Sequence, residues 1–313
     1  MKDCISWLEK RLSGNGPPVV IDGGMGTQLE KSAVPMDGKV WSGRAVLSHP
    51  HVVRQVHEDF IAAGAEVIIA NTFASARHML EPAGLGKEVK IINLNAVKLA
   101  QEARDSVAQE PVAIAGSICE WAPTDDLKWH TPEAVGFSTK EQAELLAEAG
   151  VDLIALEMCE QLDFSVAAIE AAMDTGLPIW IGMSAQTHKG CQSLSVFDYA
   201  QLDFESLVRG LSEFPAMMIN VMHTPVSDVD NAMGIVKNYW DGPIGIYPES
   251  GYFKMPNWQF IDVIETDEFA NCAKKWINNG ARLVGGCCGL GPEHIATVRQ
   301  MVNKIFENHD GKR

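Results

Sequence analysis

The stretch PVVIDGGMGT, residues 18–27, separates two ways of folding an α/β protein. Its apolar run, rich in valine and isoleucine, ends at Asp22 and is followed by glycines at 23, 24 and 26. A doubly wound sheet that binds a dinucleotide would carry the spacing G-x-G-x-x-G after its first strand, and these glycines do not have that spacing. The stretch therefore favours the other common arrangement of parallel strands, a closed barrel of β/α units.

Seven further runs of the same kind follow at intervals of about one β/α unit. Continuous apolar runs without alternation are typical of parallel strands that are buried on both faces. Eight units within 313 residues predict an α/β fold, a single (β/α)8 TIM barrel that spans residues 1–313 as one domain, with a short N-terminal helix at about 3–12. The predicted strands are 18–24, 65–73, 111–118, 151–158, 178–185, 215–222, 243–250 and 281–288.

Helical patterns lie between these runs. Each of the clearest ones closes on a glycine just beyond its last periodic residue, which is a common way to end a helix. Pro292, after the last predicted strand, is placed to open another helix. The clearest helical segments are 49–64, 138–150, 163–176 and 266–280.

The amino-acid composition indicates which classes of binding partner the protein has. Lys plus Arg number 25 against 41 Asp plus Glu, a formal charge of −16, which argues against nucleic acid or an anionic membrane as partner. No stretch approaches the roughly 20 apolar residues of a membrane helix, and the N-terminus lacks a secretory apolar core. Seven cysteines, an odd number, suit a reducing cytoplasm. We predict a cytoplasmic protein that binds small molecules. The oligomeric state stays open, a homo-oligomer included.

The strand ends carry the chemistry. Barrels of this class have their active sites where the carboxyl ends of the strands meet. Acids, small polar groups and several thiols at one mouth indicate a metal or thiol site. The side chains expected there are Asp22, Asn71, Thr72, Ser117, Cys119, Glu157, Cys159, Ser184, the group NVMH at 220–223, Tyr247, Glu249, Cys287 and Cys288.

The paired thiols of GGCCG, residues 285–289, need a special backbone. Adjacent residues on a regular strand point to opposite faces, so Cys287 and Cys288 reach one metal ion only if the strand ends irregularly there. The surrounding glycines permit such a bend, because glycine adopts conformations closed to other residues.

Four motifs together resemble the homocysteine S-methyltransferase family: DGGMGTQLE at 22–30, the segment VWSGRAVLSHPHVVRQVHEDFIAAGAEVIIANTF at 40–73, YPESG at 247–251 and GGCCG at 285–289. The resemblance implies a zinc-bearing barrel that transfers a methyl group to the thiol of homocysteine and so forms methionine. It implies that three cysteines hold the zinc, Cys287, Cys288 and one at the end of the sixth strand. It also implies that Asp22 meets the amino group of homocysteine and that Glu157 faces this substrate.

The sixth strand departs from the family pattern. Val221 stands where the family has its third cysteine, and valine cannot bind zinc. His223 lies two residues further on and should share a face with Val221 if the strand continues regularly. Since a neutral imidazole is a good zinc ligand, we expect a site of Cys287, Cys288 and His223. Cys119, Cys159 and Cys191 are alternative ligands.

The resulting hypothesis is zinc-dependent methyl transfer to homocysteine from a sulfonium or ammonium donor, such as S-methylmethionine or a betaine. The metal-activated substrate thiol is the only catalytic group that it requires. The aromatic face of Trp41 could hold a cationic donor by cation–π attraction, although Trp41 could equally be a core residue. Two alternatives stay open, a metal-dependent hydrolase or lyase on the same barrel and a non-catalytic homologue that binds a metal or thiol. The further predicted substrate contacts are Asn71, Thr72, Ser117 and Tyr247.

Overall fold

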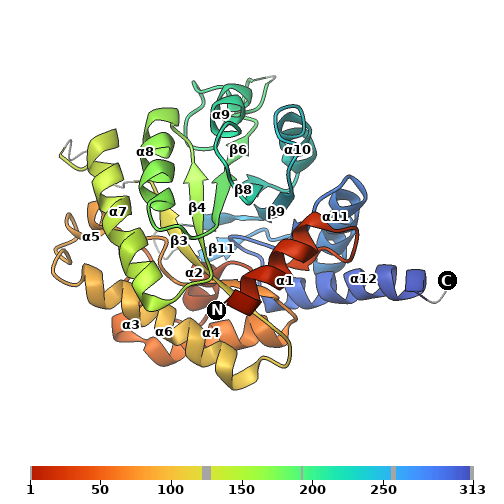
Figure 1. The fold of residues 1–313 in the computed structure, drawn as a ribbon, viewed down its shortest axis with the longest axis horizontal. Helices are drawn as coiled ribbons and strands as arrows, with labels where there is room; N and C mark the ends of the chain where they lie inside the picture. The colour runs from red at the N-terminus through yellow and green to blue at the C-terminus, as the bar shows by residue number, and fades with distance from the viewer. Residues whose placement is uncertain (1, 122–127, 192, 255–258, 311–313) are drawn as a thin grey trace.

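Eight parallel strands form a nearly closed barrel in the computed structural model, which describes residues 2–121, 128–191, 193–254 and 259–310 (Figure 1). Neighbouring strands pair in the order β1-β12-β9-β8-β5-β4-β3-β2, and a parallel bridge between Ile21 and Val67 brings the two ends of this order together. The predicted barrel is therefore confirmed, and each predicted strand overlaps an observed one, although β3, β4 and β8 extend beyond the predicted ends at 118, 158 and 222. The strands are β1 (Val19–Val20), β2 (Val67–Ile69), β3 (Ala113–Cys119), β4 (Leu153–Cys159), β5 (Ile179–Met183), β8 (Met218–Pro225), β9 (Ile244–Glu249) and β12 (Leu283–Val284).

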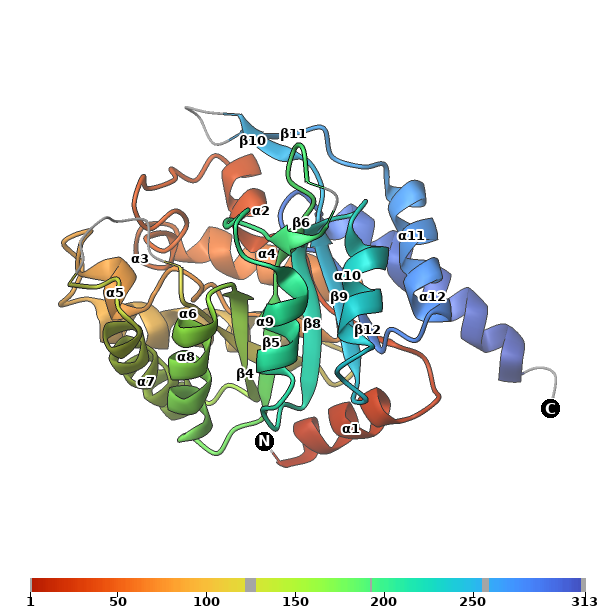
Figure 2. The same ribbon diagram turned by 90° about the horizontal axis from the view of Figure 1, so that it is seen from above.

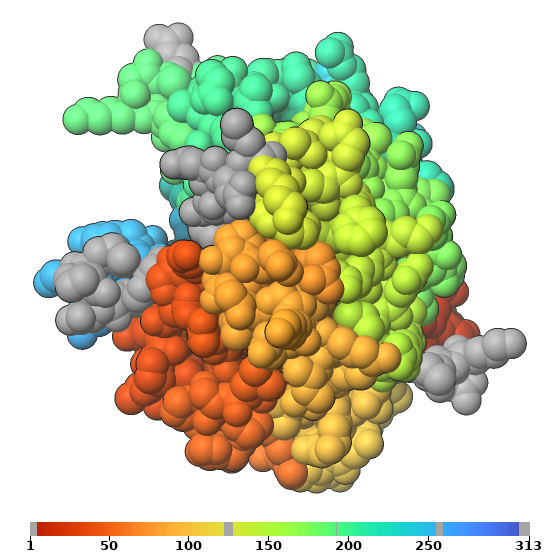
Figure 3. Space-filling model, turned by 90° about the vertical axis from the view of Figure 1, so that its left-hand side faces the viewer, coloured from red at the N-terminus to blue at the C-terminus, as the bar shows by residue number. Residues whose placement is uncertain are grey.

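Helices surround the strands. All four predicted helical segments are present, and Pro292 opens α12. The second of them begins earlier than its periodicity suggested, because the Thr131 hydroxyl accepts a hydrogen bond from the Ala134 amide at 3.2 Å and caps the helix. Figure 3 shows the segments from α3 to α7 packed side by side over one face. The helices are α1 (Lys2–Ser13), α2 (Met25–Lys31), α3 (Ala45–Ser48), α4 (Pro50–Ala62), α5 (Arg77–Leu80), α6 (Val89–Val107), α7 (Pro132–Ala149), α8 (Leu162–Met173), α9 (Phe204–Leu211), α10 (Val229–Val236), α11 (Thr266–Asn278) and α12 (Pro292–Asp310).

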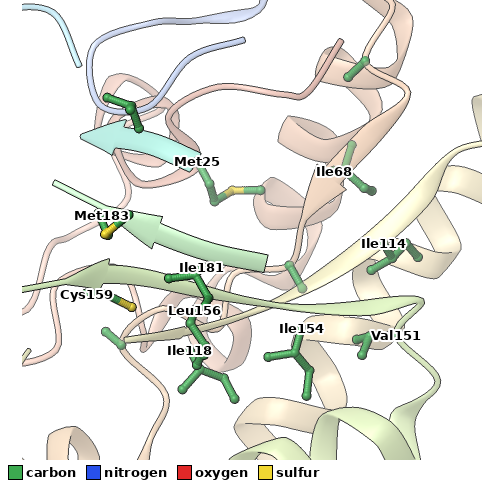
Figure 4. Close-up of a cluster of buried hydrophobic side chains, with 14 of the residues drawn as sticks. Met25, Ile68, Ile114, Ile118, Val151, Ile154, Leu156, Cys159, Ile181 and Met183 are labelled. Carbon is green, nitrogen blue, oxygen red and sulfur yellow. The ribbon is translucent and has the colours of Figure 1, made fainter. Parts of the chain in front are cut away.

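The strands bury both faces in two separate layers. Along β8, Met218 and Met222 belong to the layer inside the barrel, whereas Ile219 and Val221 belong to the layer between the strands and the helices. Figure 4 shows part of this outer layer, with Ile154 of β4 among its aliphatic side chains. Burial on both faces explains why the strands read as continuous apolar runs in the sequence.

Helix α1 closes the N-terminal end of the barrel (Figure 2). Leu8 and Leu12 pack among the interior residues and are nearly inaccessible, at 0% and 2% exposed. The Arg282 guanidinium donates hydrogen bonds to the carbonyls of Arg11, Leu12 and Gly16 at 2.6, 3.2 and 3.0 Å and ties the helix to the start of β12. The helix lies where the sequence predicted an N-terminal helix, and it covers this end of the barrel.

Two small antiparallel hairpins lie at that opposite end (Figure 2). One pairs β6 (Ala185–Gln186) with β7 (Ser195–Val196), and the other pairs β10 (Tyr252–Lys254) with β11 (Gln259–Ile261). The sequence analysis did not predict either hairpin. No helix among the described residues is long and apolar enough to cross a membrane.

Candidate metal centre and substrate site

Three side chains that could bind a metal converge at the C-terminal mouth of the barrel. One ligand atom each of His223, Cys287 and Cys288 lies within 4.8 Å of the other two. The Cys287 sulfur is 3.6 Å from His223 Nδ1. The structure thus brings together the three residues that the sequence suggested as ligands. The donor set, two sulfurs and one imidazole nitrogen, is one that zinc prefers.

The two cysteines sit on a turn beyond the end of β12. That strand stops at Val284, and a Cβ on Gly285 would lie 2.4 Å from the Ile21 carbonyl oxygen, so the chain there passes closer to β1 than a side chain would allow. Gly289 has a φ of +84°, a backbone conformation that favours glycine. Because the strand has ended, both thiols can turn toward His223.

His223 reaches the cysteines by a route that the sequence analysis did not foresee. We expected it to share a face with Val221, and this expectation is wrong. Val221 points into the outer layer, and the register of β8 shifts between Met222 and Pro225. Within that shift His223 has a φ of +45°, which is rare for a residue other than glycine. The irregular backbone, and not the two-residue period, turns the imidazole toward Cys287.

Acidic and aromatic groups surround the imidazole. His223 Nε2 is 3.5 Å from a carboxylate oxygen of Glu249, and the Phe197 ring centroid is 4.7 Å from that of His223. Burial lowers the pKa of His223, but Cys287, Glu249 and Glu160 outweigh burial and raise it to about 9. The pKa of Cys287 lies well above its usual value, because Cys288 lies beside it and both are shielded from water. A divalent cation would reverse this preference and favour the thiolates.

Asp22 offers a free acceptor atom at the same mouth. Its Oδ2 accepts a hydrogen bond from the Ile69 amide at 2.8 Å, while its buried Oδ1 has no hydrogen-bond partner among the described residues. The pKa of Asp22 is raised well above its usual value, first by complete burial and then by the nearby carboxyl of Glu157. A buried acid with an unused oxygen is suited to bind an ammonium group, which would restore its charge.

Glu157 lies on β4 and faces Ser117 of the neighbouring strand β3. The Ser117 hydroxyl donates a hydrogen bond to its Oε2 and fixes the carboxyl group. The Tyr247 hydroxyl is buried, and it has no hydrogen-bond partner that satisfies normal geometry within the described part of the chain. Burial and the negative charge of Glu157 both raise the pKa of Tyr247. Asp22, Glu157 and Tyr247 therefore form a polar end to an otherwise apolar barrel.

The polar atoms of Asn71 and Thr72 are already engaged within the protein. The Asn71 amide accepts a hydrogen bond from the Ser42 hydroxyl at 3.0 Å and donates one to the Ser42 carbonyl at 3.2 Å. The Thr72 hydroxyl donates to the Ser117 carbonyl at 2.8 Å. These contacts brace the loops after β1 and β2 around the mouth.

Trp41 stands in an aromatic cluster at the mouth. Its ring meets Phe73 edge-on at 6.4 Å and Phe253 of the β10–β11 hairpin at 5.9 Å, and Phe253 meets Phe260 at 4.6 Å. The buried Trp41 Nε1 has no hydrogen-bond partner among the residues that the structure describes. The hairpin that sequence reasoning missed thus contributes to the wall of the site.

The other cysteines lie apart from the metal-ligand group. The buried Cys119 sulfur accepts a hydrogen bond from the Trp121 amide at 3.2 Å, Cys159 packs in the outer layer, and Cys191 is exposed. Sequence reasoning also missed an acidic pair near His223. Glu160 accepts a hydrogen bond from the Asp198 amide at 3.1 Å, and burial, with Asp198 second, raises its pKa to about 9. An acid directly after a predicted strand was the available signal for Glu160.

Comparisons with known proteins agree with this architecture. The sequence pattern of the homocysteine S-methyltransferase family matches residues 19–302. Homocysteine S-methyltransferase 2 of Zea mays is 27% identical, with 92% of this chain and 91% of the relative covered, and homocysteine S-methyltransferase YbgG of Bacillus subtilis is 27% identical over 90% and 93%. Selenocysteine methyltransferase of Astragalus bisulcatus is 25% identical over 92% and 93%. The metallated homocysteine methyltransferase MmuM of Escherichia coli shares the fold, with a TM-score of 0.73 at 22% identity over 91% and 96%.

The match covers most of the chain and includes both the first-strand and the last-strand motifs. This protein therefore belongs to the homocysteine S-methyltransferase family. The predicted class of enzyme, an S-methyltransferase built on a TIM barrel, is confirmed.

Proposed function

We propose that this protein transfers a methyl group to the thiol of homocysteine, forming methionine, with one zinc ion held by Cys287, Cys288 and His223. The observation that carries the proposal is the convergence of these three ligands within 4.8 Å at the mouth of the barrel. Three protein ligands leave one position of a tetrahedral site open, as in catalytic zinc sites. Zinc, when bound, favours the ionised form of the substrate thiol, which is the nucleophile.

Two acids inside the barrel would orient homocysteine. The unused Oδ1 of Asp22 would accept a hydrogen bond from the substrate ammonium group, and Glu157, held by Ser117, would supply a second negative charge. Their distance from bulk water makes each contact stronger than it would be on the surface. An amino acid anchored in this way presents its thiol toward the cysteines.

The donor side is formed by the aromatic cluster and the acids around His223. The Trp41 ring offers a face to a sulfonium or quaternary ammonium group, and a cation bound beside Glu160, Asp198 and Glu249 would favour the ionised form of these buried acids. We therefore propose a cationic donor of the S-methylmethionine or betaine class. Much of the acceleration would come from holding the donor methyl group in line with the thiolate. A cytoplasmic location belongs to the same proposal, since a reducing compartment keeps Cys287 and Cys288 as thiols.

The direct test is the formation of methionine from homocysteine by the zinc-loaded protein, with S-methylmethionine and a betaine supplied separately. Asp22→Asn should raise KM for homocysteine about 30-fold or more, because a buried charged partner of the ammonium group is lost, and should leave the zinc content unchanged. Glu102→Gln, an exposed acid on α6, is the control. If the zinc-loaded protein fails to methylate homocysteine with either of the two donors, the proposal is wrong.

A further inference from the structure

Glu249 lies next to His223, on the side of the imidazole away from Cys287, and is not one of the three candidate metal ligands. It is the last residue of β9, and in the pairing of β9 with β8 it lies opposite Pro225. Its Oε2 lies 3.5 Å from His223 Nε2, and each of the two side chains is 13% exposed. The other ring nitrogen, Nδ1, faces Cys287 at 3.6 Å. The imidazole is therefore held between a carboxylate and the thiol pair.

This arrangement selects one form of the ring. A neutral imidazole carries its proton on one nitrogen only. In the neutral form that binds a metal, the carboxylate of Glu249 on the Nε2 side keeps the single proton on Nε2, so that the lone pair of Nδ1 faces the thiols. Carboxylates in this position behind a metal-binding histidine fix the orientation of the ring and increase its basicity.

The backbone makes such support necessary. His223 has a φ of +45°, so its own strand does not hold the side chain in a common conformation. Phe197 contacts the ring from one side, with its centroid at 4.7 Å. The other acids that interact electrostatically with the imidazole are Glu157, Glu160 and Asp198. The Ser117 hydroxyl engages Glu157, and the Asp198 amide engages one carboxylate oxygen of Glu160 at 3.1 Å. Among the described residues, Glu249 alone forms an ion pair with His223.

We propose that Glu249 is a positioning residue that fixes His223 as an Nδ1 ligand and adds negative charge next to the metal site. The proposal rests on the zinc site proposed above. Two thiolates and a neutral imidazole only balance the two positive charges of zinc. A carboxylate paired with the imidazole increases the electron density of the ligand set, which favours a reactive thiolate in the open position.

The test is a double-mutant cycle on zinc affinity, measured by competition with a chromophoric chelator. The proteins are the wild type, Glu249→Gln, His223→Ala and the double variant. Glu249→Gln should weaken zinc binding by about 10- to 100-fold. In the absence of the imidazole the same change should have no further effect, because Glu249 acts through His223. Glu102→Gln, which removes an exposed carboxylate on α6, should bind zinc as the wild type does.

The outcomes separate this inference from the proposed function. A wild type that binds no zinc overturns the metal site itself. If the wild type and Glu249→Gln bind zinc equally well, only the role of Glu249 is overturned. The same holds if Glu249→Gln reduces zinc affinity by the same factor with and without His223. Should Glu249→Gln not fold, Glu249→Asp and Glu249→Asn provide a second comparison of matched size. The aspartate variant should then bind zinc more tightly, and equal affinities would contradict the inference.

Discussion

At the scale of single residues, the metal site depends on one unusual backbone angle. The φ of +45° at His223 costs on the order of 1–3 kcal/mol for a residue other than glycine. Such strain persists only where the surroundings hold it, and here Cys287, Glu249 and Phe197 all contact the ring. Bound zinc would add a further contact. The contacts around His223 therefore offset the cost of its backbone conformation.

A second residue, His57 of α4, gives the protein a defined acid sensitivity. His57 is fully buried, and neither ring nitrogen has a hydrogen-bond partner within the described residues. Burial lowers its pKa from 6.5 to about 3. Below pH 6.5 the imidazole of His57 is protonated in the unfolded chain but stays neutral in the folded protein. The free energy of unfolding therefore decreases as the pH falls from 6.5 toward 3.

We therefore expect His57→Leu to lose less stability in acid than the wild type. The difference in the free energy of unfolding should grow in favour of the variant by up to about 1.4 kcal/mol per pH unit below 6.5, or roughly 2 kcal/mol at pH 5. Urea unfolding at pH 7.5 and pH 5 measures it, and His51→Gln on the same helix is the exposed control. Parallel losses in wild type and His57→Leu would show that His57 does not titrate on unfolding.

At the scale of elements, the end of β8 is held irregular by its own side chains. The buried hydroxyl of Thr224 accepts a hydrogen bond from the Ala185 amide at 3.0 Å and donates one to the Met222 carbonyl at 3.0 Å. The bond to Met222 spans His223, the residue whose backbone is turned, and the bond from Ala185 ties this strand end to β6. The conformation of His223 is thus a property of the whole strand end.

Thr224→Val should test this role with almost no change in shape. The loss of the hydroxyl leaves the Ala185 amide unpaired, which should destabilise the protein by about 1–3 kcal/mol and weaken zinc binding together with it. Thr224→Ser keeps the hydroxyl and is the matched control. Both quantities follow from thermal unfolding of the metal-free and the zinc-loaded protein. Zinc affinity that is equal in the valine and serine variants would contradict the link between the strand end and the site.

The elements also show what sequence could and could not predict. The eight strands were predictable, because burial on both faces makes them continuous apolar runs. The β6–β7 and β10–β11 hairpins were not, since their strands are two or three residues long and all except β7 include residues that are not buried. The geometry at His223 was also not predictable, because period-two reasoning assumes the regular strand that the shift at Met222 interrupts.

At the scale of the whole molecule, the barrel brings distant residues to one mouth. Asp22, Glu157, His223 and Cys287 lie on or just after four different strands, and they come together because the strands run parallel and close into a barrel. The sequence predicted these residues through their places at the ends of apolar runs. It could not predict Glu249 as the partner of His223, because that contact joins the irregular ends of two neighbouring strands.

The zinc content of the purified protein tests the central claim most directly. Elemental analysis should find about one zinc per chain in the wild type, as a site with three protein ligands requires, and little in His223→Ala or Cys288→Ala. Cys191→Ala, which removes an exposed thiol, should retain its zinc. If His223→Ala keeps its full metal content, the histidine is not a ligand and the account of this site is wrong.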